Sequence, residues 1–268
     1  MADDIGMDVI VNELDRLYET YHEDRYKASP LLVGMVKEGK IGRMAGQGFY
    51  ASREFENVRF SVNDKHVGTL ILNRPQRANA LNNAFLDEIN HVLDAVERDP
   101  NVRCLVITGA GKNFSAGADM SGFASGRPDD LLQTCTLGHD AFTRFETFPK
   151  PVIAAINGPA MGGGFELSLA CDIRIMSSKA FVQLPEVNLG LFPGWGGTQR
   201  LPRLIGMGKA KQIVLLAEKI DAAKALEYGL VNFVAEPADF DAFVQQIAEK
   251  LVKASPLGLK MAKTVMHY

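Results

Sequence analysis

Cysteine is scarce in this sequence, and long apolar runs are missing. The three cysteines, Cys104, Cys135 and Cys171, are odd in number and widely spaced, so they indicate neither a disulfide framework nor a zinc site. The longest apolar runs, such as Val152–Ile156, are far shorter than the roughly 20 residues that a spanning helix needs. The N-terminus lacks the basic-then-apolar pattern of a signal peptide. We therefore expect a reduced, cytoplasmic protein with no membrane association.

An excess of either charge is also missing. The chain has 29 basic and 32 acidic residues, a formal net charge of -3, so no basic field for nucleic acid is expected. A phosphate-bearing ligand is still allowed, since it needs only a few cations or helix N-termini. The histidines are scattered and no pair has ligand spacing, which predicts no metal site. No GxGxxG follows a strand, which argues against a nucleotide-binding domain.

The first 56 residues form a segment of their own. Residues 4–22 have helical periodicity, and a second short helix is predicted over Pro30–Lys37, with proline in its first turn. Residues 39–50 are rich in glycine and predict a loop, and 53–57 look like a linker. We predict a helical domain over 1–56 and a larger domain over 57–268.

The larger domain alternates strands and helices. It begins with a predicted hairpin, 58–62 and 67–72, followed by an amphipathic helix over 83–98 and a continuously apolar strand at 104–107. The same rhythm then continues, with strands predicted at 152–156, 173–175 and 230–234 and helices at 163–171, 210–217, 222–228, 240–253 and 256–266. This pattern predicts an α/β fold with crossover helices.

Two glycine-rich turns, 113–120 and 157–166, each follow an apolar strand. Their small residues allow a close approach to the backbone. The second runs directly into an apolar helix, whose unpaired N–H groups suit developing negative charge on an oxygen. Either turn alone could simply be a tight connection.

Two carboxylates have apolar sequence neighbours. Glu166 lies in the first turn of the helix after the second glycine-rich turn, and Glu186 follows twenty residues later. Such surroundings raise a carboxyl pKa and suit acid–base chemistry near neutral pH. The simpler readings are a helix-dipole charge for Glu166 and a solvated loop residue for Glu186. The segment 191–200, with the single tryptophan, Trp195, could wall a pocket or be a turn.

In order, these segments resemble the crotonase family over about residues 57–265. The likeness is carried by the stretches 73–75, 79–81, 114–119, 150–158, 162–167, 170–173, 185–190 and 196–201. The resemblance implies a spiral of ββα units with a small N-terminal helical appendage. It also implies an acyl-CoA thioester substrate whose enolate is stabilised by the N–H groups of Ala118 and Gly163, with no cofactor beyond the CoA of the substrate.

The resemblance further implies that Glu166 and Glu186 are the catalytic pair of an enoyl-CoA hydratase. Glu166 would deprotonate a water as it attacks C3, and Glu186 would deliver a proton to C2. The implied substrate and CoA contacts are Arg77, Ala78, Ala80, Leu81, Gly117, Asp119, Met120, Gly162, Pro185, Gly194 and Trp195. Two alternatives stay open: an enoyl-CoA Δ-isomerase of the same family, and a non-catalytic acyl-CoA-binding or assembly module.

Residues 3–50 resemble the end of the C-terminal domain of 3-hydroxyacyl-CoA dehydrogenases, as at the junction of a fused dehydrogenase–hydratase. We expect a structural role for this segment, with a dehydrogenase partner as a further implication. The family resemblance implies a homo-oligomer, a trimer or hexamer. Compared with the family pattern, the last C-terminal helices are expected to be missing.

Overall fold

The computed structural model describes residues 6–38, 55–123 and 128–267. The chain divides into two compact units, residues 1–55 and 56–268. In the first unit, helices α2 (Met7–Tyr21) and α3 (Pro30–Lys37) are joined through the short 3-10 helix η1 (Asp24–Tyr26). They pack around a small core of Met7, Val11 and Leu32. Both predicted helices are present, and the predicted loop over 39–50 lies outside the described residues.

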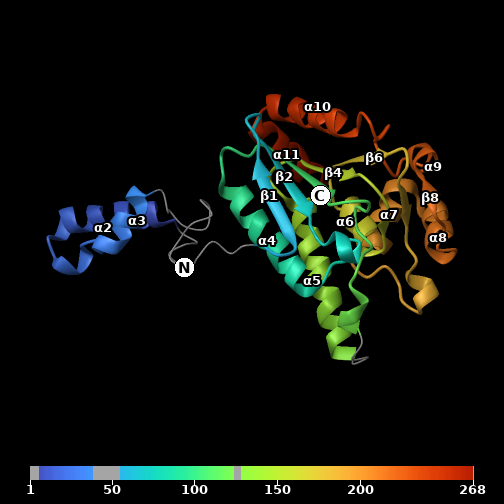
Figure 1. Cartoon of the computed structure of the whole chain (residues 1–268), viewed down its shortest axis with the longest axis horizontal. Coiled ribbons are helices and arrows are strands. Elements are labelled where there is room, and N and C mark those ends of the chain that lie inside the picture. Colours follow the sequence, from blue (N-terminus) through green and yellow to red (C-terminus); the bar gives the residue numbers. More distant parts are fainter. Residues whose placement is uncertain (1–5, 39–54, 124–127, 268) are drawn as a thin grey trace. The chain divides into compact units, whose positions relative to one another are not determined.

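The second unit is built on a six-stranded sheet with the order β1-β2-β3-β4-β6-β9 (Figure 1). Its first two strands form an antiparallel hairpin, and every later pairing in this sheet is parallel. The hairpin and the α/β class are therefore confirmed. The strands are β1 (Val58–Val62), β2 (Val67–Leu72), β3 (Cys104–Gly109), β4 (Val152–Ile156), β6 (Ile173–Ser177) and β9 (Phe233–Ala235).

Both faces of this sheet are apolar, as expected for parallel strands covered by helices. On one face, Cys104 and Val106 of β3 pack with neighbouring strands against Phe240 and Val244 of α10 (Phe240–Lys253). The alternate residues of β3 point to the other face. Helix α4 (Asn83–Arg98) begins after Asn82, whose side-chain oxygen accepts the N–H of Phe85.

The last helix, α11 (Pro256–His267), is held to the sheet by a largely buried ion pair. Lys263 Nζ donates to Asp172 Oδ2 at 2.6 Å and to the carbonyl of Lys150 at 3.0 Å. Asp172 Oδ2 also accepts the N–H of Val152 at 2.7 Å, at the start of β4. Three segments far apart in sequence therefore meet at one carboxylate.

Several short elements were not predicted from the sequence. A second sheet joins β5 (Ala160–Met161), β7 (Phe181–Gln183) and β8 (Ile220–Asp221), and its strands are too short to carry a periodic signal. Helix α5 (Pro128–Thr147) was also missed. The predicted strand over 230–234 begins only at Phe233. Gly229 turns the chain with φ 75°, and the N–H groups of Leu230 and Val231 still donate to the carbonyl of Ala225 in the preceding helix. The remaining elements are η3 (Pro75–Arg77), η4 (Met120–Phe123), α6 (Gly163–Leu169), η5 (Glu186–Leu189), α7 (Gly197–Ile205), α8 (Met207–Leu215) and α9 (Ala222–Glu227).

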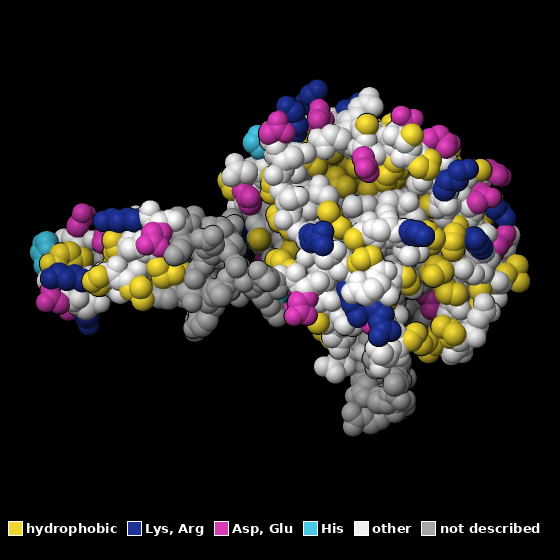
Figure 2. Space-filling view, viewed as in Figure 1, with side chains coloured by type: hydrophobic (Ala, Val, Ile, Leu, Met, Phe, Trp, Pro, Cys, Tyr) yellow, Lys and Arg dark blue, Asp and Glu magenta, His cyan; other side chains and the backbone are white. Residues whose placement is uncertain are grey.

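Basic and acidic side chains are interspersed on the viewed face of the second unit (Figure 2). This agrees with the near balance of charges in the sequence. Within the described ranges, no helix combines the length and apolar character needed to cross a bilayer.

Candidate active site

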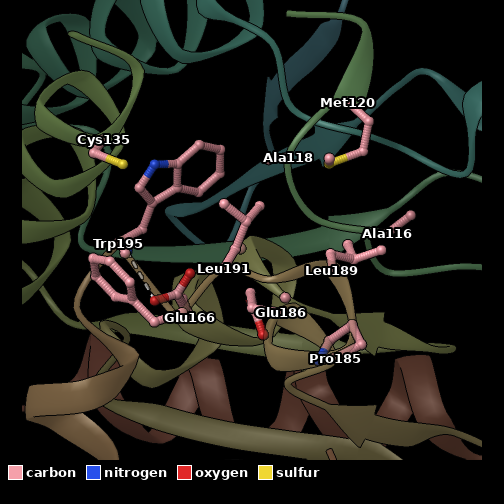
Figure 3. Close-up of a pocket in the computed structure, with 14 residues that line it drawn as sticks. Ala116, Ala118, Met120, Cys135, Glu166, Pro185, Glu186, Leu189, Leu191 and Trp195 are labelled. Carbon is pink, nitrogen blue, oxygen red and sulfur yellow. Dashed lines mark hydrogen bonds between the residues drawn. The ribbon is translucent and has the colours of Figure 1, made fainter. Parts of the chain in front are cut away.

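A pocket of about 250 Å³ collects residues from five separate stretches of the second unit. The turns after β3 and β4 supply its two backbone edges, and α5, η5 and the loop before α7 supply its walls. In Figure 3 the carboxyl groups of Glu166 and Glu186 lie next to each other on one side, with Met120 and Cys135 on the other. The lining residues are Ala116, Ala118, Met120, Cys135, Gly162, Gly163, Glu166, Pro185, Glu186, Leu189, Leu191, Phe192, Gly194 and Trp195.

The two glycine-rich turns meet at this pocket. Leu81 donates its N–H to Gly117 at 2.7 Å and accepts the N–H of Asp119 at 2.8 Å, so the intervening Ala118 N–H takes no part in this bridge. An added Cβ at Gly163 would lie 3.5 Å from the Ala118 nitrogen, which places the two residues side by side. Within the described part of the chain, neither the Ala118 nor the Gly163 N–H has a backbone acceptor among the turn and loop hydrogen bonds.

Glycine is required at both positions of the second turn. Gly162 has φ 49°, and a Cβ there would lie 2.9 Å from Glu186 Oε1. A Cβ at Gly163 would lie 2.4 Å from two ring carbons of Trp195. A side chain at either position would displace the carboxylate or the indole.

Glu166 is almost wholly buried, with 2% of its surface exposed. Its Oε1 accepts two backbone N–H groups, from Trp195 at 2.9 Å and from Gly197 at 2.8 Å. These donors come from a loop about thirty residues away, so a helix-dipole charge alone does not account for this side chain. Burial raises the pKa of Glu166 to about 8, the Gly197 and Trp195 N–H groups oppose that rise, and nearby Glu186 adds to it.

Glu186 begins η5 and is half-buried rather than solvated. Its Oε2 is inaccessible to solvent and has no hydrogen-bond partner within the described ranges. Burial raises the pKa of this carboxyl as well. With a pKa of about 8, Glu166 is largely protonated near neutral pH in the unliganded site. The Gly197 and Trp195 N–H groups favour its ionised form, which is the form able to act as a base.

Trp195 packs between helix α5 and the second glycine-rich turn. Its Nε1 donates to the Thr134 carbonyl of α5 at 3.2 Å, and its ring meets Phe142 edge-on with centroids 5.4 Å apart. The ring is wedged between Gly138 and Gly163, where added Cβ atoms would lie 2.3 and 2.4 Å from it. The predicted segment 191–200 is therefore a loop over 191–196, which forms a pocket wall, followed by the first turn of α7.

The residues predicted from the sequence fall into two groups. Ala118, Gly163, Glu166, Glu186 and five of the predicted contacts line the pocket; the five contacts are Met120, Gly162, Pro185, Gly194 and Trp195. The other six do not line it: Arg77, Ala78, Ala80, Leu81, Gly117 and Asp119.

Leu81 and Asp119 border a second pocket of about 280 Å³ at the start of α4. Asp119 pairs there with Arg74 at 3.0 Å. The hydroxyl of Ser121, followed by its N–H and Arg74, lowers the pKa of Asp119 against its partial burial. Arg77 is exposed at the end of η3.

Sequence reasoning did not single out Ala116, Cys135 or Leu189 as lining residues. Ala116 lies in the first glycine-rich turn and Leu189 at the end of η5, and both belong to motifs that the sequence had indicated. Cys135 lies on α5, which was not predicted. The spacing of the buried residues Ala141, Phe142 and Phe145 could have revealed that helix. No group of His, Cys, Asp and Glu residues within the described ranges is placed to hold a metal ion.

Comparisons with known proteins define the class. A family model described as enoyl-CoA hydratase/isomerase matches residues 63–268, and one described as 3-hydroxyacyl-CoA dehydrogenase, C-terminal domain, matches residues 1–52. The chain therefore belongs to the enoyl-CoA hydratase/isomerase family. This confirms both resemblances inferred from the sequence.

Individual relatives agree with this assignment. The short-chain-enoyl-CoA hydratase of Clostridium acetobutylicum is 44% identical over 80% of this chain and 82% of its own length. The crotonyl-CoA hydratase of Syntrophomonas wolfei is 43% identical over the same shares. The crystal structure of an enoyl-CoA hydratase from Bacillus anthracis has a TM-score of 0.77 at 40% identity, covering 79% of this chain and 83% of that one. The crotonase-like fold is therefore confirmed.

Proposed function

We propose that the chain is an enoyl-CoA hydratase, which adds water across the 2,3 double bond of a 2-enoyl-CoA to give a 3-hydroxyacyl-CoA. The observation that carries this proposal is the pairing of Glu166 and Glu186 on one side of a pocket, beside the N–H groups of Ala118 and Gly163. Relatives of more than 40% identity that bear hydratase names support it.

In this mechanism the thioester carbonyl accepts the N–H groups of Ala118 and Gly163. These donors stabilise the enolate oxygen that forms when C3 is attacked. Glu166, with Oε1 committed to Trp195 and Gly197, offers its other oxygen to a water molecule and takes its proton as the water attacks. Glu186 gives its proton to C2, and the pair then exchanges a proton to return to its starting state.

The apolar lining of the pocket suits the acyl chain. Met120, Leu191, Phe192 and Trp195 surround the space beside the carboxyls, so an uncharged tail is favoured there. Arg77, Ala78, Ala80, Leu81, Gly117 and Asp119 stay proposed contacts for the CoA portion, outside the acyl pocket. The reaction is redox-neutral, so it needs no electron-accepting cofactor.

The test is the loss of conjugated enoyl-thioester absorbance when the full chain meets crotonyl-CoA, with product identified by mass and retention. We expect hydration by the parent chain and a loss of at least roughly a hundredfold in kcat for Glu186→Gln and for Glu166→Gln. Exposed Glu227→Gln is the matched control and should retain parental activity. Migration of the double bond without water uptake would identify an isomerase. Binding of crotonyl-CoA without turnover would identify a non-catalytic module.

We also infer a homo-oligomer, and a dehydrogenase as partner of the N-terminal unit. An exposed apolar row on α11, Leu257, Met261 and Val265, has the four-residue spacing of a helical contact face. The match of residues 1–52 to a dehydrogenase domain supports the second inference. Sedimentation of the full chain, alone and with a 3-hydroxyacyl-CoA dehydrogenase, tests both. A monomeric chain would contradict the homo-oligomer, and the absence of a complex with the dehydrogenase would contradict the second inference.

A further inference from the structure

Arg200 is a buried cation one helical turn behind the catalytic loop. It lies on α7, and only 7% of its side chain is exposed. Its Nε donates to Glu146 Oε2 at 2.9 Å, its Nη2 approaches the same oxygen at 2.8 Å, and its Nη2 also donates to Thr143 at 3.3 Å. Both partners belong to α5. The guanidinium is therefore anchored on one side by a neighbouring helix.

On its other side, Arg200 holds the loop that carries the hydrogen-bond donors of Glu166. Its Nη1 donates to the carbonyl of Trp195 at 2.9 Å. Gly196 follows with φ 106°, and a Cβ there would lie 1.9 Å from Nη1, so the guanidinium fills the space that a side chain would need. The Trp195 and Gly197 N–H groups on either side of Gly196 both donate to Glu166 Oε1. A continuous chain of contacts thus runs from Glu146 through Arg200 to the Glu166 carboxylate.

This chain of contacts determines which oxygen of Glu166 remains for substrate. Two N–H groups on Oε1 fix the carboxylate plane and leave Oε2 for the pocket. No hydrogen bond joins Arg200 to Glu166 within the described residues, so the arginine acts on the carboxylate through the loop and through its charge. A lysine at this position would supply a single ammonium, which cannot bridge Glu146 and the Trp195 carbonyl with the planar fork of a guanidinium.

We propose that Arg200, anchored by Glu146, is a positioning residue that orients the Glu166 carboxylate for hydration. This inference rests on the proposed function. The titratable groups that act on Glu166 are Glu186 from η5 and Arg200 from α7. Cys135 from α5 also faces Glu166, whose charge raises the pKa of that thiol after burial does. The Gly197 and Trp195 N–H groups and, after them, the charge of Arg200 lower the pKa of Glu166 against its burial. Misplacement of these two donors should therefore raise that pKa even when a lysine keeps the charge.

The test compares Arg200→Lys and Glu146→Gln with the parent, using Arg203→Lys as the matched control because Arg203 is exposed on the same helix. We expect Arg200→Lys to lower kcat roughly tenfold to a hundredfold through misplacement of the base. KM for crotonyl-CoA should stay close to parental, and the acidic limb of the kcat–pH profile should move to higher pH. Glu146→Gln should change both in the same direction by less, and Arg203→Lys should change neither.

A second readout does not depend on turnover. The carboxyl stretch of Glu166, assigned by infrared difference against Glu166→Gln, gives its titration directly. An upward shift of the Glu166 pKa in Arg200→Lys supports the positioning role even if the parent chain does not hydrate crotonyl-CoA. Absence of hydration by the parent chain would contradict only the proposed function. Parental kcat and titration in Arg200→Lys would overturn the inference. So would a loss of activity that only follows the folded fraction, with the titration unchanged.

Discussion

Replacing Glu166 by glutamine should stabilise the fold, and the gain should grow with pH. In the folded chain, burial raises the pKa of Glu166 from 4.5 to about 8. Between these values the folded state binds more protons than the unfolded state, so stability falls as pH rises. This contribution is fully present below pH 4.5 and is lost as pH rises through 8. Glutamine removes the ionisation and still accepts the Trp195 and Gly197 N–H groups through its amide oxygen.

The size of the effect follows from the shift. From pH 5 to pH 7.5, the free energy of unfolding of Glu166→Gln relative to the parent should increase by about 3 kcal/mol, at roughly 1.4 kcal/mol per pKa unit. Urea unfolding of both proteins at the two pH values measures this directly, with Glu227→Gln as the exposed control. An equal difference at both pH values would refute the idea that a buried, protonated carboxyl is present. We expect the same variant to lose its hydratase activity. The buried carboxyl that the proposed reaction needs would then lower the stability of the fold near neutral pH.

Three further predictions concern neighbouring features. Gly163→Ala should push the indole of Trp195 away from the turn and lower kcat at least roughly tenfold. Because Trp195 is the single tryptophan of the chain, fluorescence would detect its displacement as a shift in emission. An emission spectrum like that of the parent would contradict the packing described for this ring. Glu186→Gln should lower the pKa of Glu166, because the like charge of Glu186 raises it. Infrared titration of the Glu166 carboxyl measures this shift, and an unchanged pKa would show that the two carboxyls are uncoupled. Lys263→Met should lower the free energy of unfolding by about 3 kcal/mol, because it removes the ammonium group that pairs with Asp172. Urea unfolding measures this loss. An unchanged stability would show that the N–H of Val152 is sufficient for that carboxylate.

Elements with strong periodicity could be predicted from the sequence. The α4 helix has its apolar residues on one stripe and ends before Asp99-Pro100, so its predicted and observed bounds coincide at 83 and 98. The β1–β2 hairpin was also anticipated, because Asn63-Asp64 falls between two strand patterns. The two- and three-residue strands of the second sheet are specified by tertiary contacts rather than by local pattern, so no periodicity could have indicated them.

The site was predicted unevenly for the same reason. Glu166 and the glycine-rich turn before it are close in sequence, so their joint position at a helix N-terminus could be inferred. The two N–H donors of Glu166 lie about thirty residues further on, and their contact depends on the path of the loop over 191–196 that leads into α7. Cys135 and the anchor Glu146 come from a helix whose apolar stripe is interrupted by Gly138 and polar residues. Only folding brings these segments to one pocket.

The position of both carboxyls on one side of the pocket has a stereochemical consequence. A water activated by Glu166 and a proton released by Glu186 would reach the double bond from the same face, so hydroxyl and hydrogen would be added syn. In heavy water the deuterium at C2 would then be placed on a single face, and the alcohol at C3 would form in a single configuration. Because two N–H groups hold Oε1 of Glu166, its Oε2 would keep the water on that face.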